Sequence, residues 1–492
     1  MRMSIIFESV NDNAIASATF IENKFRKTGA TGPIPQKVAV LAHYNAGKTP
    51  TDNIGVKIES ADDAADRAGL GSMAHRMFLK LFGAIGSALI DLYWFPLAAG
   101  TGSSTGTITV AITTVTAGTK YFYIAGKKVA VIVPAGSTAA AIGALIVAAI
   151  NADTSLPVTA ANVDEVVTLT AKWAGLSANQ ITIESDLGAS DSSLAPGGCT
   201  FAIVDMAGGS ANPTIATALA NFGDTFYTFV VCPFNEDGSL DLLEAAGAVR
   251  IGDSVKKPFV GVVGYNDTRA NYITYLASRN SPWSTSMPVE GSPNHPAEIA
   301  ASVVGVCAAS AQRDPARPFK NLELYDIMPG TGAEWTGSQK DAIELLGGSA
   351  FRLINGAVFI HDLLNTYTTN EYGAADDSWR YAVTITNIQA KYYSMDAVFN
   401  AEPFDRAIVV DDAAVTSKPY AISPVKAKAY AVALVDYWIS QGWSKNRNDI
   451  VAGIVTEINA LNPGRIDILI PDIISVGLRI VAIKYNWAFQ AA

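Results

Sequence analysis

The segment TFYTFVVCPF, Thr225–Phe234, holds a short apolar run flanked by Thr and Pro, which predicts a strand buried on both faces. A helical pattern follows over Leu240–Val249, then a second apolar run over Phe259–Val263 and a second helical pattern over Thr268–Ser278. Strands that alternate with helices usually pair in parallel and carry helices on both faces. This part of the chain therefore predicts an α/β core with a parallel sheet.

The same pattern is present nearer the N-terminus. The apolar run Val38–Ala42 predicts another buried strand, Met73–Leu92 predicts a helix and Tyr93–Leu97 predicts a further strand. The composition then changes at AAGTGSSTGT, residues 98–107, where Gly, Ser and Thr dominate. Such a stretch is typical of a linker, so we expect a new unit to begin there.

We expect an inserted β-rich domain over residues 100–190, which ends at a second flexible stretch, GASDSSLAPGG. Its expected elements are strands and one Ala-rich helix in the order strand, strand, helix, strand, strand. They cover Thr107–Val115, Tyr121–Val133, Ser137–Asn151, Val163–Thr170 and Gln180–Glu184.

Further helices are predicted downstream, beginning at Pro296, over Ser338–Leu346, and from Ser423 to Gly442. The predicted fold class is a multidomain α/β and α+β protein, with a mixed-sheet core, flanking helices, the β-rich insertion and extended strand arms at both ends. The expected divisions are an N-terminal arm (1–30), a core domain in two parts (31–99 and 191–375), the insertion (100–190), a C-terminal inner core domain (376–470) and a C-terminal strand arm (471–492).

Both ends of the chain carry apolar residues at alternate positions, which predicts strands. A terminal strand this apolar must be held in a sheet, either its own or that of a neighbouring molecule. The residues expected to form such inter-subunit strands are Ile5, Phe7, Val481, Ile483, Tyr485, Trp487 and Phe489.

Composition excludes several classes of protein. The 35 basic and 45 acidic residues give a net charge of −10 without a Lys/Arg block, which argues against direct nucleic-acid binding. Three widely spaced cysteines form neither a disulfide framework nor a zinc pattern. The start MRMSIIFES does not resemble a signal peptide, and the most apolar stretches are shorter than the ~20 residues of a membrane span, so we expect no membrane insertion.

The motif nearest to an enzymatic one is AHYNAGKT, Ala42–Thr49, directly after a predicted strand. It resembles a phosphate-binding loop in which Lys48 would reach phosphates, Thr49 would hold magnesium, and Asp411 of RAIVVDD would supply a second magnesium ligand. Pro50 and the segment after it predict loop and strand, however, and the dipole of a following helix would then be missing. A surface loop is the favoured interpretation.

Other reactive side chains do not form a recognisable constellation. The four histidines have no i, i+4 partner and no nearby cysteine, so zinc-ligand spacing is absent from the sequence. Asp376 and Asp377 lie in a Gly/Ala/Asp loop that is typical of solvated turn carboxylates. We therefore expect no enzymatic activity, no metal and no cofactor.

Taken in order, several local patterns resemble the contractile tail sheath proteins of bacteriophages, most of all those of Mu-type phages. The resemblance spans nearly the whole chain apart from about 100–190, where sheaths carry variable insertions. The segments that carry it are SIIF (4–7), KVAVLAH (37–43), GLGSMAHRMF (69–78), MPVEGSPNHPAEIAASVVGV (287–306), AQRDPARPF (311–319), ELLGGSAFRLINGAVFIHDLLNTYT (344–368) and NPGRIDILIPDIISVGLRIVAI (462–483).

The resemblance implies a structural subunit that forms a helical homopolymer around a tail tube, with baseplate and tail terminator proteins as further partners. Terminal arms would complete the sheets of neighbouring copies, and contraction from a metastable extended state would drive the tube through the host envelope for genome ejection. The implied location is the virion tail, after assembly in the host cytoplasm. Two alternatives stay open: the sheath of a phage-derived bacteriocin or contractile injection particle, and a nucleotide-driven assembly ATPase using Lys48, Thr49 and Asp411.

Overall fold

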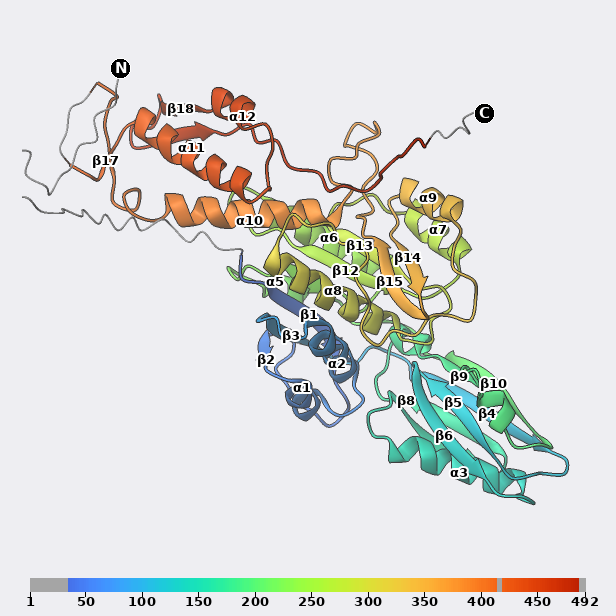
Figure 1. Ribbon diagram of the computed structural model, residues 1–492. Helices are drawn as coiled ribbons and strands as arrows, with labels where there is room; N and C mark the ends of the chain where they lie inside the picture. The colour runs from blue at the N-terminus through green and yellow to red at the C-terminus, as the bar shows by residue number, and fades with distance from the viewer. Residues whose placement is uncertain (1–33, 414–417, 486–492) are drawn as a thin grey trace, which may run out of the picture.

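The computed structural model describes residues 34–413 and 418–485, and its centre is a six-stranded sheet (Figure 1). The strand order is β13-β12-β11-β1-β3-β2; the first five strands are parallel, and β2 is an antiparallel edge strand. The strands are β1 (Lys37–His43), β2 (Val56–Ile58), β3 (Asp91–Leu97), β11 (Phe229–Val231), β12 (Val260–Tyr265) and β13 (Ser284–Pro288). The parallel sheet predicted from the apolar runs is confirmed.

Helix α8 (Pro296–Arg313) lies against the middle of this sheet and contacts β11, β12 and β13. It begins at Pro296, as the sequence predicts, and almost all of its residues are buried. Small side chains allow a close approach to α2 (Met73–Ile85), because a Cβ on Gly305 would lie 2.5 Å from that of Ala84. Helix α2 is shorter than predicted, since Gly86 takes a φ of +57° and ends it.

Gly264 of β12 is a position where the fold requires glycine. A Cβ added there would lie 1.8 Å from the carbonyl oxygen of Pro296, which is backbone at the start of α8. We expect Gly264→Ala to lower the free energy of unfolding by at least about 1–3 kcal/mol, because the strand and the helix must move apart. Gly238→Ala is the matched control, since nothing lies within 4 Å of its added Cβ. Similar urea-unfolding midpoints for the two variants would contradict this prediction.

Residues 105–207 form two antiparallel sheets at one end of the molecule (Figure 1). One has the order β10-β4-β8-β7 and the other β6-β5-β9, and α3 (Ala139–Ala152) buries Ile142, Ile146 and Ile150 against them. The strands are β4 (Thr105–Ile112), β5 (Gly118–Ile124), β6 (Lys127–Val133), β7 (Val158–Val163), β8 (Val166–Ala171), β9 (Ile183–Ser185) and β10 (Cys199–Ala207).

Three strands expected in this region are wrong in their bounds. Tyr121–Val133 is the hairpin β5–β6 instead of one strand, because Ala125 and Gly126 take φ values of +46° and +75° and reverse the chain. Val163–Thr170 likewise spans the turn between β7 and β8, where Asp164 has a φ of +50°. The expected strand Gln180–Glu184 begins with the end of a 3-10 helix, Leu176–Gln180, before β9.

The opposite end of the molecule is mainly helical and has its own apolar cluster around Trp438, Trp443 and Leu434 (Figure 1). Helix α10 (Ala382–Phe399) joins the two parts: Val383 and Ile385 belong to the main core, and Ala390 belongs to this second cluster. The other elements here are β16 (Ile408–Val409), β17 (Ala421–Ile422), α11 (Pro424–Ser440), α12 (Arg447–Gly453), β18 (Val455–Ile458) and β19 (Ile466–Leu469).

Beside β13 of the main sheet lie α9 (Gly337–Leu345) and the hairpin of β14 (Ala350–Ile354) and β15 (Ala357–Asp362) (Figure 1). The predicted multidomain α/β class with a mixed-sheet core is confirmed. Across the described residues, none of the helices is both long enough and apolar enough to cross a membrane.

Candidate functional site

The loop that resembles a phosphate-binding motif has a different geometry. In the fully described stretch between Thr49 and Ser60 no helix follows; the chain instead forms the edge strand β2. The Lys48 ammonium donates to the carbonyl oxygen of Asp66 at 2.6 Å. Asp411 follows β16, which pairs with β17 and lies outside the sheet that contains β1. Lys48, Thr49 and Asp411 therefore do not form the alternative phosphate and magnesium site, and Ala42–Thr49 ends in the favoured surface loop.

The histidines have structural contacts. His43 is fully buried at the end of β1, its Nδ1 lies 2.9 Å from the carbonyl oxygen of Ala98, and burial lowers its pKa to about 4. His75 accepts from the backbone amide of Gly71 at 3.0 Å, and burial lowers its pKa to about 4 as well. His295 caps the start of α8. Such histidines stay neutral and support the fold.

Carboxylates also stay dispersed. Within residues 34–413 and 418–485, no three His, Cys, Asp or Glu side chains gather closely enough to hold a metal ion. Asp376 accepts from the hydroxyl of Tyr367 at 2.7 Å and from the amide of Ser378 at 2.9 Å, so it stabilises its own loop.

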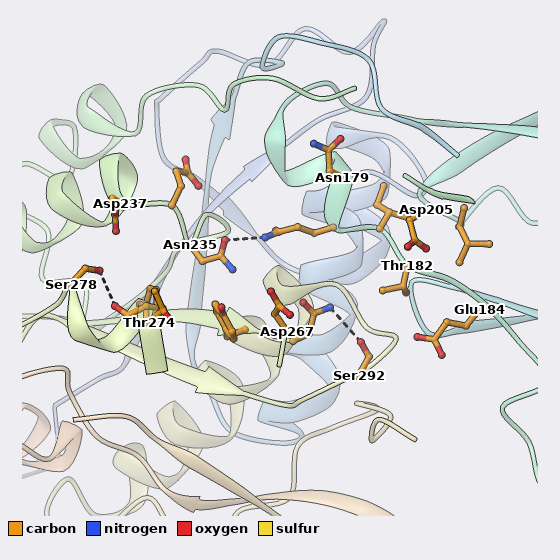
Figure 2. A pocket seen from close by; sticks show the side chains of 18 residues that line it. Asn179, Thr182, Glu184, Asp205, Asn235, Asp237, Asp267, Thr274, Ser278 and Ser292 are labelled. Carbon is orange, nitrogen blue, oxygen red and sulfur yellow. Dashed lines mark hydrogen bonds between the residues drawn. The ribbon is translucent and has the colours of Figure 1, made fainter. Parts of the chain in front are cut away.

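An open cleft of about 980 Å³ lies where the carboxyl ends of β11 and β12 face the inserted sheets. Figure 2 shows Glu184 and Asp205 on one side of it and Asp237 and Asp267 on the other. Burial raises the pKa of Glu184, and the charge of Asp205 raises it further. The carboxyl ends of parallel strands are a common ligand position. The carboxylates and amides that line this cleft are spread over its walls, and its lining shows no pair of a nucleophile and a base.

The C-terminal segment is the most unusual surface of the molecule. Residues 473–475 pair with residues 443–445, through Lys445 N to Ile473 O at 2.9 Å and Ser475 N to Trp443 O at 3.0 Å. Beyond this point the described residues 476–485 form no strand. Val481, Ile483 and Tyr485 are 67%, 82% and 81% exposed. The described part of the predicted strand, up to Tyr485, is thus not paired in a sheet with other described residues.

The other residues expected in the arms cannot be placed. Ile5, Phe7, Trp487 and Phe489 lie outside the described residues.

Sequence reasoning missed a buried ion pair between two helices that are distant in sequence. Arg76 of α2 donates through Nε to Glu298 of α8 at 2.6 Å, and both side chains are nearly fully buried. Arg76 also donates through Nη2 to the carbonyl oxygen of Ala125, in the β5–β6 turn, at 2.7 Å. The only sequence signal was that Arg76 interrupts the apolar face of a predicted helix.

Comparison with known proteins finds a relative by sequence. No family model matches the chain. The tail sheath protein of the Mu-like prophage FluMu of Haemophilus influenzae is 26% identical over 399 residues, which are 80% of this chain and 81% of the relative.

Two solved structures cover most of the chain at low sequence identity. A sheath tail protein from Desulfitobacterium hafniense has a TM-score of 0.49 and 12% identity, over 89% of this chain and 93% of that one. The sheath of an extracellular contractile injection system, PVC, in its contracted state has a TM-score of 0.49 and 9% identity, over 96% and 98%.

The sequence relationship confirms the resemblance that the ordered motifs carry. It extends over four fifths of both chains, far beyond any single motif. The chain is therefore similar, over most of its length, to the tail sheath protein of a Mu-like prophage.

Proposed function

We propose that the chain is the structural subunit of a contractile tail sheath and that it polymerises by giving its C-terminal segment to a neighbouring copy. The relationship to the Mu-like prophage sheath protein supports the class of function. The observation that carries the mechanism is the apolar, unpaired segment 480–485, because exposed alternating apolar residues at a chain end need a partner.

In the proposed contact the segment adds to the edge of a neighbour's sheet as an extra strand. Val481, Ile483 and Tyr485 then point to one side of that strand. Each contributes about 1.5–3 kcal/mol when fully buried, and backbone hydrogen bonds fix the register. Trp487 and Phe489 continue the same alternation in the sequence, and Ile5 and Phe7 are proposed to act in the same way at the N-terminal end.

We propose the hairpin β18–β19 as the acceptor. Among the described residues it is a sheet of two strands, so the outer edges of both are available. Two-stranded sheets are marginally stable alone, and added strands would stabilise this one. Val455 and Leu469, a pair in the hairpin, are 52% and 60% exposed and offer apolar surface to an added strand.

The proposed contraction is a rearrangement of rigid subunits connected by these segments. Subunits assembled around a tail tube in an extended state would rotate as rigid bodies when a baseplate releases them, without losing their neighbours. A few kcal/mol per subunit, summed over a cooperative lattice, makes such a change effectively irreversible. The energy is stored in the assembly, so hydrolysis of a nucleotide is not required.

The remaining partners and the location follow from this role and are part of the proposal. They are the tail tube, the baseplate and the tail terminator as protein partners, assembly in the host cytoplasm, and a final place in the virion tail, where contraction drives the tube through the host envelope.

Electron microscopy of the purified protein tests the proposal. We expect hollow tubes that grow with protein concentration and that form equally well with and without ATP and magnesium. Particles that remain single at every concentration would overturn the proposed polymer. Tubes that form only with ATP would instead support the assembly ATPase.

A further inference from the structure

We propose that Arg479 anchors the C-terminal segment to its own subunit and thereby fixes Ile480 as the first residue that a second copy can receive. This inference rests on the proposed strand exchange, since it names the residue that positions the exchanged segment.

Arg479 connects the C-terminal segment with the end of β15 and the start of α10, both far from it in sequence. Its Nη1 donates to the carboxylate of Asp362, the last residue of β15, and the Asp362 side chain is about nine-tenths buried. Its guanidinium carbon lies 3.3 Å from the centre of the Tyr381 ring, directly before α10. A guanidinium that pairs with a buried carboxylate and stacks on an aromatic ring is held in one geometry.

The backbone next to Arg479 is held as well. The Lys320 ammonium donates to the carbonyl oxygen of Leu478 at 2.7 Å. Gly477 lies so close to Pro318 that an added Cβ would be 2.1 Å from its Cγ. Residues 477–479 are therefore bound to the surface by a side chain, a backbone carbonyl and a close packing contact.

Up to Arg479 the exposure alternates along the chain, with Val476 and Leu478 each 70% exposed, and from Ile480 to Tyr485 every described residue is exposed. The Arg479 side chain is 14% exposed, whereas Ile480 is 84% exposed. Val481, Ile483 and Tyr485 are 67%, 82% and 81% exposed, and the small Ala482 is exposed as well. Arg479 is thus the last residue of the described segment whose side chain is held against its own subunit.

The anchor sets the length of the free segment. The preceding backbone attachment is the bond from Ser475 N to Trp443 O. If the Arg479 contacts are lost, the free segment begins up to four residues earlier, which adds about 13 Å of reach at ~3.3 Å per residue. The exchanged strand would then leave its own subunit at a variable residue. A pulling force on that strand would no longer act directly on β15 and α10 through the Arg479 contacts.

Limited thermolysin digestion of the isolated subunit, kept below its assembly concentration, tests the anchor. Thermolysin cuts before bulky apolar residues, so the wild-type products should end at or after Arg479. In Arg479→Gln, and in Asp362→Asn, we expect cleavage before Val476 and before Leu478 to become at least tenfold faster. The first products should then end at Ser475 or Gly477, as read by mass spectrometry. Arg447→Gln is the matched control, because Arg447 pairs with the half-exposed Asp436 elsewhere on the surface.

Two results would overturn the anchor: an unchanged pattern in both variants, or wild-type cleavage before Val476 at the rate seen in the variants. Thermal unfolding at the wild-type temperature shows that the variants are folded, and if Arg479→Gln is not, Asp362→Asn and Tyr381→Ala give the same comparison.

The digestion does not depend on polymerisation. Absence of wild-type tubes together with the expected shift would reject the proposed function and keep the anchor, whereas tubes with an unchanged pattern would reject only the anchor.

Discussion

Removal of residues 480–492 is expected to abolish tube formation and to leave the free energy of unfolding of the subunit within about 0.5 kcal/mol of wild type. The described part of this segment buries almost none of its apolar surface in its own chain, so its loss removes little folding energy. Ending the chain after Arg479 keeps the contacts with Asp362 and Lys320, so the surface below the segment stays covered. Sedimentation and electron microscopy measure assembly, and urea unfolding measures stability.

The alternation of the segment provides a sharper control than the deletion. A strand presents successive side chains to opposite faces, so only one set enters the acceptor. We expect the triple change Val481→Ser, Ile483→Ser and Tyr485→Ser to prevent tubes, and the double change Ala482→Ser and Lys484→Ser to permit them. A deletion variant that unfolds, or that still forms tubes, would contradict the proposed exchange.

Arg76→Met is expected to destabilise the subunit by about 3–5 kcal/mol, because it leaves the Glu298 carboxylate buried without its main partner. Glu298 is 2% exposed, and the remaining groups near its Oε2 are Asn294 Nδ2 at 3.3 Å and Lys80 Nζ at 3.9 Å. The change also removes the hydrogen bonds to the carbonyl oxygens of Ala125 and Ser155, which tie the inserted sheets to the core. Urea unfolding of the monomer gives the measurement.

Two variants separate burial of charge from loss of an arginine. Arg67→Met removes an ion pair to Asp63 of similar length, 2.6 Å, but the Arg67 side chain is 49% exposed, so the loss should be below about 1 kcal/mol. The double change Arg76→Met and Glu298→Met should recover a large part of the stability, because no unpaired charge remains. Equal effects of Arg76→Met and Arg67→Met would show that the buried pair has no special role.

Several elements were predictable because their pattern is local. Strands β1, β11 and β12 are continuous apolar runs that only a sheet covered on both sides can bury. Helices α8 and α11 begin at Pro, directly after a capping residue. Each of these features depends on a few neighbouring residues, and the local pattern predicts the same element that the fold contains.

Helix α10 shows where local patterns mislead. The apolar spacing predicts no helix over 382–399, a stretch in which polar residues are frequent. In the structure Gln389 is fully buried and donates to the carbonyl oxygens of Thr228 and Pro258, and buried Lys391 donates to Asp472 at 2.5 Å. Their partners lie more than 80 residues away in sequence, so the pattern of the helix alone could not reveal that they are buried.

The sequence by itself determined the class of the fold, the parallel core strands and the apolar alternation at the C-terminal end, because each follows from the spacing of apolar residues along a short stretch. The tertiary structure decided which charges are buried and where that end leaves the molecule. Arg76 meets Glu298 across 222 residues and Arg479 meets Asp362 across 117. Contacts over such separations depend on how distant elements pack, and no short stretch of sequence carries that information.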